Sequence, residues 1–315
     1  MVVKVEALVK RYDKLVALDY LDLQVQEGEI FGLLGPNGSG KTTAINCILS
    51  LLKYDKGSIE IFDKPMGPDA YDIKKDIGII MQNVAVFDEL TVYENISYFC
   101  SLYVKDKKEI KRLTKEAIEF VSLEEFQKFY PKKLSGGLLR RLNIACGIVH
   151  KPKLIILDEP TVAVDPQSRN KILEGIKKLN EEGATIIYTS HYMEEVEQLC
   201  SNIAIIDKGR VIAKGTKEEL KSMISIGEKV TVETYNMEEE QCKEIKNLPG
   251  IYSVDYHDNL LEIKSGKGKN NLVHILEYLG QKNIGFGRVT TEMPTLNDVF
   301  LEITGKELRD LVEGK

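Results

Sequence analysis

The stretch "EIFGLLGPNGSGKTTAI", residues 29–45, decides the fold of the core. An apolar run that predicts a strand leads into a loop of the form G-x-x-x-x-G-K-[ST], and a helix is predicted from Lys41 onward. Glycines let backbone N–H groups close around phosphates, Lys41 can reach the terminal phosphates, and Thr42 offers a hydroxyl to Mg²⁺. The strand before the loop and the helix after it favour a phosphate-binding loop over a ligand-free glycine turn.

An acidic pair closes a second apolar run. "KLIILDEPT", residues 153–161, predicts a buried strand that ends at Asp158 and Glu159. In a parallel sheet, ligands bind at the carboxyl ends of the strands. One acid can serve Mg²⁺ while the other orients and polarises an attacking water. Such a pair is by itself more often a helix cap or a solvated turn, but a phosphate loop in the same chain favours the functional interpretation.

Three further side chains are candidates of the same kind. His191 follows the predicted strand "ATIIYTS" and could touch a terminal phosphate, and Gln82 follows "DIGIIM". Tyr12, in "VKRYDKLVAL", could stack on a purine base, although a half-buried structural tyrosine is the simpler interpretation. A lone histidine is likewise more often structural than functional.

A second anion site is predicted at "PKKLSGGLLRRL", residues 131–142. Ser135, Gly136 and Gly137 precede an apolar run that predicts a helix, and a helix N-terminus attracts negative charge. The chain would then have two phosphate sites, which one nucleotide bound to a single chain does not require.

The organisation of the chain follows from its periodicity. Strands and helices alternate, which predicts an α/β core with a parallel, helix-covered sheet, and a block of helices at about 88–150 interrupts it. Thr91 and Glu94 have the spacing of a capping box in that block. The strands are expected at 2–9, 21–25, 29–34, 57–62, 76–81, 154–158, 184–190 and 202–207, and the helices of the core at 41–52, 166–181 and 192–200.

A separate region begins at about residue 228. Its segments predict the order β, α, β, β, α, β, which is that of a small α+β, ferredoxin-like unit. We therefore predict two domains, residues 1–222 and residues 228–304.

Composition limits the classes of partner. The net charge of −6 argues against nucleic acid as the main partner, because phosphate neutralisation needs clustered basic residues. The five cysteines are odd in number and widely spaced, so we expect buried thiols in a reducing cytosol. No stretch approaches the roughly 20 apolar residues of a membrane span.

Taken together, "GPNGSGKT", Gln82, "LSGG", "LIILDEP" and His191, in this order and spacing, resemble the ATP-binding cassette (ABC) family, the motor subunits of ABC transporters. The resemblance covers residues 1–222 and implies a P-loop NTPase core. It also implies a head-to-tail dimer, in which each ATP lies between the P-loop of one subunit and the LSGG segment of the other. Two sites in one chain would then belong to two different nucleotides.

The resemblance implies a role for each matching residue. Tyr12 corresponds to the adenine-stacking aromatic, Glu159 to the catalytic base and His191 to the switch histidine. Gln82 corresponds to the glutamine that contacts Mg²⁺ or the attacking water, and Asp158 corresponds to the Walker B acid that binds the metal, with Thr42 as a further metal ligand. Asp165 corresponds to an aspartate at the dimer seam, and Ser135, Gly136 and Gly137 correspond to contacts made with ATP in trans. The Walker A loop corresponds to Gly35, Pro36, Asn37, Gly38, Ser39, Gly40, Lys41, Thr42 and Thr43.

Two positions depart from the family pattern. Leu138 stands where the family usually has Gln, Glu or Met, and "TVAVDP" replaces the commoner T-S-G-L-D-P before Asp165. Neither change removes a group that would hold phosphate, metal or water, so an active ATPase is expected.

The C-terminal "PTLNDVFLEITGKEL", residues 294–308, resembles exporters of the ABC-2, drug- and antibiotic-resistance type. In that type a separate transmembrane permease is the partner, which implies a homodimeric ATPase held at the inner face of the cell membrane. The alternatives are a soluble ABC ATPase of the translation or repair class and a regulator that binds nucleotide without hydrolysing it. Glu159 and His191 disfavour the regulator, and the absence of a second cassette disfavours the soluble class.

Overall fold

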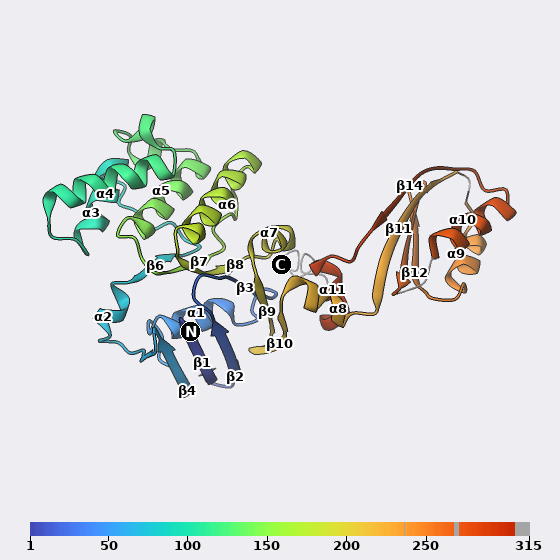
Figure 1. The fold of residues 1–315 in the computed structure, drawn as a ribbon, viewed down its shortest axis with the longest axis horizontal. Coiled ribbons are helices and arrows are strands. Elements are labelled where there is room, and N and C mark those ends of the chain that lie inside the picture. Colours follow the sequence, from blue (N-terminus) through green and yellow to red (C-terminus); the bar gives the residue numbers. More distant parts are fainter. Residues whose placement is uncertain (236, 268–270, 306–315) are drawn as a thin grey trace. The chain divides into compact units, whose positions relative to one another are not determined.

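The computed structural model describes residues 1–235, 237–267 and 271–305 (Figure 1). The chain divides into two compact units, one formed by Met1–Lys217 and one that begins at Glu218.

The centre of the first unit is a six-stranded sheet in the order β10-β9-β3-β8-β7-β6. The strands from β9 to β6 are parallel, and β10 pairs antiparallel with β9. The strands β3, β7 and β8 are buried along their whole length, as a sheet covered on both faces requires. The predicted parallel α/β core is confirmed, and β10 is an addition. The bounds are β3 Ile30–Leu34, β6 Ile77–Ile80, β7 Leu154–Asp158, β8 Thr185–Thr189, β9 Asn202–Asp207 and β10 Arg210–Gly215.

A second, antiparallel sheet has the order β2-β1-β4-β5. It consists of β1 Val3–Tyr12, β2 Leu15–Val25, β4 Lys56–Ile61 and β5 Lys64–Pro65. The expected strand at 21–25 was too short, because β2 begins at Leu15. Its first half has exposed apolar residues and register shifts against β1, which removes the simple alternation that a sequence pattern can detect.

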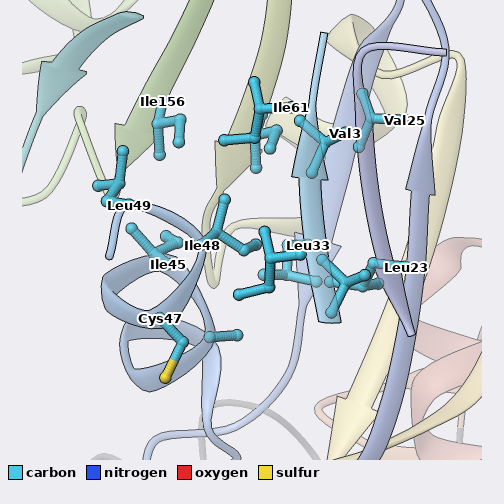
Figure 2. Packing of buried hydrophobic residues seen from close by; sticks show 14 of the residues in the cluster. Val3, Leu23, Val25, Leu33, Ile45, Cys47, Ile48, Leu49, Ile61 and Ile156 are labelled. Atoms are coloured by element: carbon cyan, nitrogen blue, oxygen red, sulfur yellow. The ribbon is translucent and has the colours of Figure 1, made fainter. Parts of the chain in front are cut away.

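The main core of this unit lies between the two sheets and helix α1, Lys41–Ile48 (Figure 2). Ile45 and Ile48 of α1 pack with residues of β1, β2, β3, β4 and β7, and this packing fixes the start of the helix behind the glycine loop. The helix expected over 41–52 ends four residues earlier, since Ser50 has a positive φ of 53°.

The predicted helical block is confirmed as α3 Val92–Ser101, α4 Lys107–Phe120 and α5 Gly136–Ile148, which contact one another (Figure 1). Between α4 and α5 lie the 3-10 turns Glu124–Phe126 and Pro131–Lys133. The Thr91–Glu94 capping box is present at the start of α3. The remaining helices of the unit are the short α2, Tyr71–Lys74, which the sequence did not indicate, and the expected α6 Pro166–Glu181 and α7 Met193–Leu199.

The second unit contains a four-stranded antiparallel sheet in the order β12-β13-β11-β14. With α9 after β11 and α10 after β13, this arrangement confirms the predicted ferredoxin-like fold. Its core joins the sheet to both helices through Val230, Val232, Ile245, Ile263 and Ile275. The strands are β11 Ile226–Thr234, β12 Ile251–His257, β13 Leu260–Gly266 and β14 Phe286–Glu292.

The helices α9 Glu239–Lys246 and α10 Asn271–Gln281 belong to this fold, while α8 Lys217–Met223 precedes it and α11 Leu296–Thr304 follows it. Helix α11 forms most of the "PTLNDVFLEITGKEL" segment, whose residues 306–308 lie outside the described part of the chain.

The cysteine side chains and the character of the helices bear on two predictions made from composition. All five cysteines are free, and four of them are buried as expected, but Cys242 on α9 is only half-buried. Within residues 1–235, 237–267 and 271–305, no helix combines the length and the apolar character needed to cross a membrane.

Candidate nucleotide-binding site

The glycine loop between β3 and α1 is tightly packed from behind. A Cβ atom at Gly35 would lie 2.3 Å from the carbonyl oxygen of Ile206, and one at Gly40 would lie 2.7 Å from that of Ala17. Gly40 also has a φ of 109°, in the left-handed region that favours glycine. Only glycine fits these two positions, so the loop can curl closely enough for its N–H groups to surround an anion.

Lys41 lies inside this loop. Its Nζ donates to the carbonyl oxygens of Gly35 at 2.7 Å and Pro36 at 3.2 Å, and the residue is only 6% exposed. Burial lowers the pKa of Lys41 more than the nearby charges of Glu159 and Asp158 raise it. The buried ammonium and the buried, unpartnered hydroxyl of Ser39 are groups that a phosphate would satisfy, so the loop fits a nucleotide phosphate.

Asp158, at the end of β7, connects the loop to the sheet. Its Oδ2 accepts a hydrogen bond from Thr42 Oγ1 at 3.1 Å, and its Oδ1 accepts one from Thr189 Oγ1 at 2.7 Å. The aspartate is 2% exposed. Together, the Thr42 hydroxyl and the Asp158 carboxylate are the hard oxygen ligands that Mg²⁺ prefers, so the donor set fits this ion.

Glu159 is held in a strained backbone conformation, with a φ of 49°. Thr189 supports it, because the Glu159 N–H donates to the Thr189 carbonyl oxygen at 3.2 Å and to Thr189 Oγ1 at 2.9 Å. This bend directs the chain away from β7 immediately after Asp158, which lets two successive carboxylates contact different partners.

The Glu159 carboxylate meets two other predicted residues. Gln82 Nε2 donates to Glu159 Oε2 at 3.2 Å, and His191 Nδ1 lies 3.6 Å from the same oxygen. The pKa of Glu159 lies below its usual value, because the imidazole of His191 and the charges of Lys41 and Arg140 outweigh the cost of burial. Glu159 is therefore ionised at neutral pH and can accept a proton.

Two supporting residues were not predicted from the sequence. Thr189 contacts both acids, and Arg140 donates from Nη1 to the carbonyl oxygen of Met81 at 3.1 Å, next to Gln82. A sequence signal existed for Thr189 alone: a hydroxyl residue at the carboxyl end of a strand that is expected beside the acidic strand.

The segment after Gln82 is clamped by two asparagines of the helical block. Asn143 Oδ1 accepts from Ala85 N at 3.0 Å, and Asn95 Oδ1 accepts from Phe87 N at 2.8 Å. Asn95 Nδ2 also donates to the carbonyl oxygen of Phe87 at 2.9 Å, and Asn95 is fully buried. The position of Gln82 is thereby tied to helices α3 and α5.

The predicted second anion site lies at the start of α5. Ser135 caps the helix by accepting from Leu138 N at 3.4 Å, and both Ser135 and Gly136 are exposed. Gly137 is buried against α6, where a Cβ atom would lie 2.3 Å from Ser168 Oγ and 2.9 Å from Asp165 Oδ2. Asp165 caps α6 through the Ser168 N–H at 2.9 Å. Within the described part of the chain, this segment thus packs against α5 and the start of α6 and not against the glycine loop.

Tyr12 closes β1 and is 45% exposed. Lys10 Nζ lies 5.1 Å from the centre of its ring. The half-exposed ring could stack on a planar ligand, but its contact with Lys10 does not join it to the other predicted residues.

Comparison with known proteins agrees with this geometry. A family model described as "ABC transporter" matches residues 18–162, and one described as "ATP-binding protein DrrA1-3-like, C-terminal domain" matches residues 215–304. The linearmycin resistance ATP-binding protein LnrL of Bacillus subtilis (strain 168) is 39% identical over 97% of this chain and 99% of its own length. The chain belongs to the ABC transporter family. It is an ATP-binding subunit of an ABC transporter, and it is an ATPase whose hydrolysis is coupled to transport.

Two further matches support this ABC assignment. The daunorubicin resistance ATP-binding protein DrrA3 of Streptomyces coeruleorubidus is 32% identical over 98% of this chain and 97% of its own length. Among solved structures, a dimeric ATP-binding cassette in a post-hydrolysis state bound to ADP and Pi has a TM-score of 0.63 and 28% identity, covering 68% of this chain and 98% of that one. The P-loop NTPase fold of the ABC core is thereby confirmed.

Proposed function

We propose that this chain powers export through a separate ABC-2 type permease, as one half of an ATPase dimer at the inner face of the cell membrane. The resistance functions in the names of LnrL and DrrA3 support export as the direction. ATP hydrolysis is supported above all by one observation: Gln82 and His191 both contact the same oxygen of Glu159. The neighbouring Asp158 accepts a hydrogen bond from Thr42.

The roles of the residues follow from their chemistry. The glycine loop and Lys41 hold the phosphates of ATP, with Tyr12 stacking on the adenine. Glu159 accepts the proton of the attacking water, and His191 and Gln82 position that water and the carboxylate. Thr42, Asp158 and Gln82 would hold Mg²⁺, which when bound neutralises charge on the phosphate oxygens.

The dimer is proposed because the second anion site, at the N-terminus of α5, is incomplete within one chain. Ser135 and Gly136 are exposed at the N-terminus of a 13-residue helix, where backbone N–H groups and the helix dipole favour an anion. Ser135 contacts α5 of its own chain, and the neighbouring Gly137 packs against the start of α6, so neither contact involves the glycine loop of the same chain. A second copy would supply the loop, with Asp165 at the seam. We infer that nucleic acid is not a partner, since the chain is acidic overall.

The permease contact is proposed for an apolar patch that we call the outer patch, formed by Val84, Phe87, Tyr98, Leu102 and Tyr103. Each of these side chains is at least 36% exposed, and Leu102 is 60% exposed. The rings of Phe87 and Tyr98 meet edge to face at 5.1 Å. Because Asn95 and Asn143 clamp the segment between Gln82 and this patch, movement of Gln82 would be transmitted to a permease seated there.

The C-terminal part is proposed as a separate functional domain. Residues 1–222 would form the ATPase domain, with the helical block at 88–150, and residues 228–304 the accessory domain. We propose that the accessory domain steadies or regulates the dimer. Unchanged ATPase rate, dimerisation and transport after deletion of the residues beyond 228 would refute that role.

The experiment that tests the partner uses the tagged chain extracted from detergent-solubilised membranes. We expect a polytopic membrane protein to purify with it in stoichiometric amount. Phe87→Asp should abolish this association while basal ATP hydrolysis persists, and Tyr20→Asp, which likewise replaces an exposed aromatic residue, should retain it. A wild-type chain that purifies from membranes without a polytopic partner would contradict the proposal.

A further inference from the structure

Glu195, on α7, is a buried acid that the mechanism above does not use. It is 3% exposed, and its Oε2 accepts hydrogen bonds from three hydroxyl groups. The donors are Tyr188 at 2.6 Å, Thr161 at 2.8 Å and Ser190 at 2.9 Å. The other oxygen, Oε1, lies 3.4 Å from Nε of Arg169, on α6.

Two of the donors lie in the loops that carry the proposed base and the switch histidine, and the third, Tyr188, lies on β8. Thr161 follows Glu159 by two residues, and Ser190 directly precedes His191. Ser190 Oγ also accepts from the N–H of Tyr192 at 3.0 Å, so the backbone is fixed on both sides of His191. Glu195 therefore connects the turn that follows Glu159 to the loop that carries His191.

Arg169 adds a second contact to the histidine loop. Its guanidinium lies over the ring of Tyr192, 4.5 Å from the ring centre, and the rings of Tyr192 and His191 are 4.2 Å apart. The cation that balances Glu195 thus also packs behind His191.

A buried carboxylate is costly unless it is paired and hydrogen-bonded, and a well-packed apolar residue would often be at least as stable in its place. Three charge-assisted hydrogen bonds and one cation compensate the charge of Glu195. The direction of these bonds has a geometric consequence. Thr161 and Ser190 both donate to Oε2 of Glu195, so their positions are fixed relative to the same atom. The distance between the neighbouring Glu159 and His191 is thereby fixed as well.

We infer that Glu195 is a positioning residue for hydrolysis, holding Glu159 and His191 at the distance at which they can act on one water. This inference rests on the proposed roles of Glu159 and His191. Glu195 does not touch the reacting atoms; it acts through the two loops.

The test is steady-state hydrolysis by the full chain with Mg²⁺ and ATP. Glu195→Gln keeps the size of the side chain but removes its charge. We expect kcat to fall about tenfold, which corresponds to a rise of about 1.4 kcal/mol in the activation barrier, while KM for ATP stays within twofold. Glu194→Gln is the matched control, the same substitution at an exposed neighbour on the same helix, and should leave kcat unchanged.

Coupling to the histidine separates positioning from a merely structural role. In a His191→Ala background, Glu195→Gln should cause less than a twofold further loss, because the distance between His191 and Glu159 that Glu195 maintains no longer matters once the histidine is gone. A lowered Tm with unchanged kcat, or a full additional tenfold loss in the His191→Ala background, would overturn the inference. If Glu195→Gln fails to fold, Ser190→Ala cuts only the link to the histidine loop and is expected to lower kcat at least threefold, and an unchanged kcat would again overturn it.

Failure of this inference can be distinguished from failure of the proposed function. If Glu159→Gln abolishes hydrolysis but Glu195→Gln matches the wild type, only the positioning role is wrong. If Glu159→Gln hydrolyses ATP at the wild-type rate, the assignment of the base is wrong, and the positioning role falls with it.

Discussion

Gln82 donates a hydrogen bond from Nε2 to Oε2 of Glu159 at 3.2 Å. These residues come from neighbouring strands of the central sheet, Gln82 from just after β6 and Glu159 from just after β7. The contact connects the proposed proton acceptor to the segment that Asn143 and Asn95 clamp to the helical block. A change at the phosphate site can therefore reach the outer patch through a short chain of direct contacts.

Glu159→Gln is expected to abolish turnover and to preserve ATP binding. The amide keeps the shape of the carboxylate but cannot accept the proton of water, and loss of a general base typically costs 10²–10⁴-fold. Phosphate release and nucleotide binding should be measured on the same preparation, together with the oligomeric state in ATP, where we expect a trapped dimer. Hydrolysis at the wild-type rate would remove Glu159 as the base.

Thr189→Val should weaken both the fold and the site. The substitution keeps the volume of a fully buried side chain but removes the donor to Asp158 Oδ1 and an acceptor of the Glu159 N–H. We expect the free energy of unfolding to fall by about 1–3 kcal/mol and kcat to fall at least tenfold.

Thr185→Val, at the other end of the same strand, is the control for that change. Thr185 is 1% exposed and its hydroxyl accepts from Gly28 N at 2.9 Å, away from the acids. Denaturant unfolding should show a similar loss of stability for both variants, but kcat should fall for Thr189→Val alone. Equal effects on kcat would mean that Thr189 acts only through stability.

The parts that could be predicted from the sequence are those with a local signature. The glycine loop and the acids at the end of β7 each lie within one strand–loop–helix segment, and the Ser135 cap directly precedes α5, so spacing alone identifies them. Thr189 carries only a weak signal and Asn95 carries none, because a hydroxyl at a strand end and an amide in a helix are both common. Their importance comes from partners that the fold brings near, Thr189 to an acid 31 residues away.

The burial of Glu195 could not be predicted from the sequence either, because it also depends on partners that the fold brings near. On an amphipathic helix an acid is expected to face solvent, and Glu194 does so, whereas Glu195 is buried because three hydroxyls from two separate segments of the chain meet it. Similarly, the first half of β2 was missed because its exposed residues and register shifts conceal the period of two.

A mixture of two inactive variants tests whether the site is shared between chains. Lys41→Ala removes the phosphate contact of the glycine loop, and Ser135→Arg places a bulky cation at the second anion site. Each homodimer would have two defective sites, but a heterodimer can collect both lesions in one site and keep the other intact. We expect each variant to be inactive alone and the mixture to recover activity, up to half of the wild-type rate per heterodimer. A mixture as inactive as its components, with heterodimers present, would contradict sharing.

The C-terminal unit should lose stability in acid through Asp298. This residue completes the capping box of α11 by accepting from the N–H of the N-cap residue Thr295 at 2.9 Å, and it pairs with Lys264 Nζ at 2.9 Å. Burial opposes its charge, but these bonds outweigh burial and leave the pKa of Asp298 below its usual value. A lowered pKa in the folded state gives stability that is present above the unfolded pKa, near 3.9, and is lost as the pH falls through the folded pKa.

Asp298→Asn should therefore destabilise the protein by about 1–2 kcal/mol at pH 7, and the difference from the wild type should shrink as the pH is lowered from about 5 to 3. The substitution keeps an oxygen that can cap the helix, so the change isolates the charge and its pairing with Lys264. Calorimetric unfolding of the full chain across this range measures both curves. Curves that remain parallel down to pH 3 would show that the carboxylate charge does not stabilise the C-terminal unit.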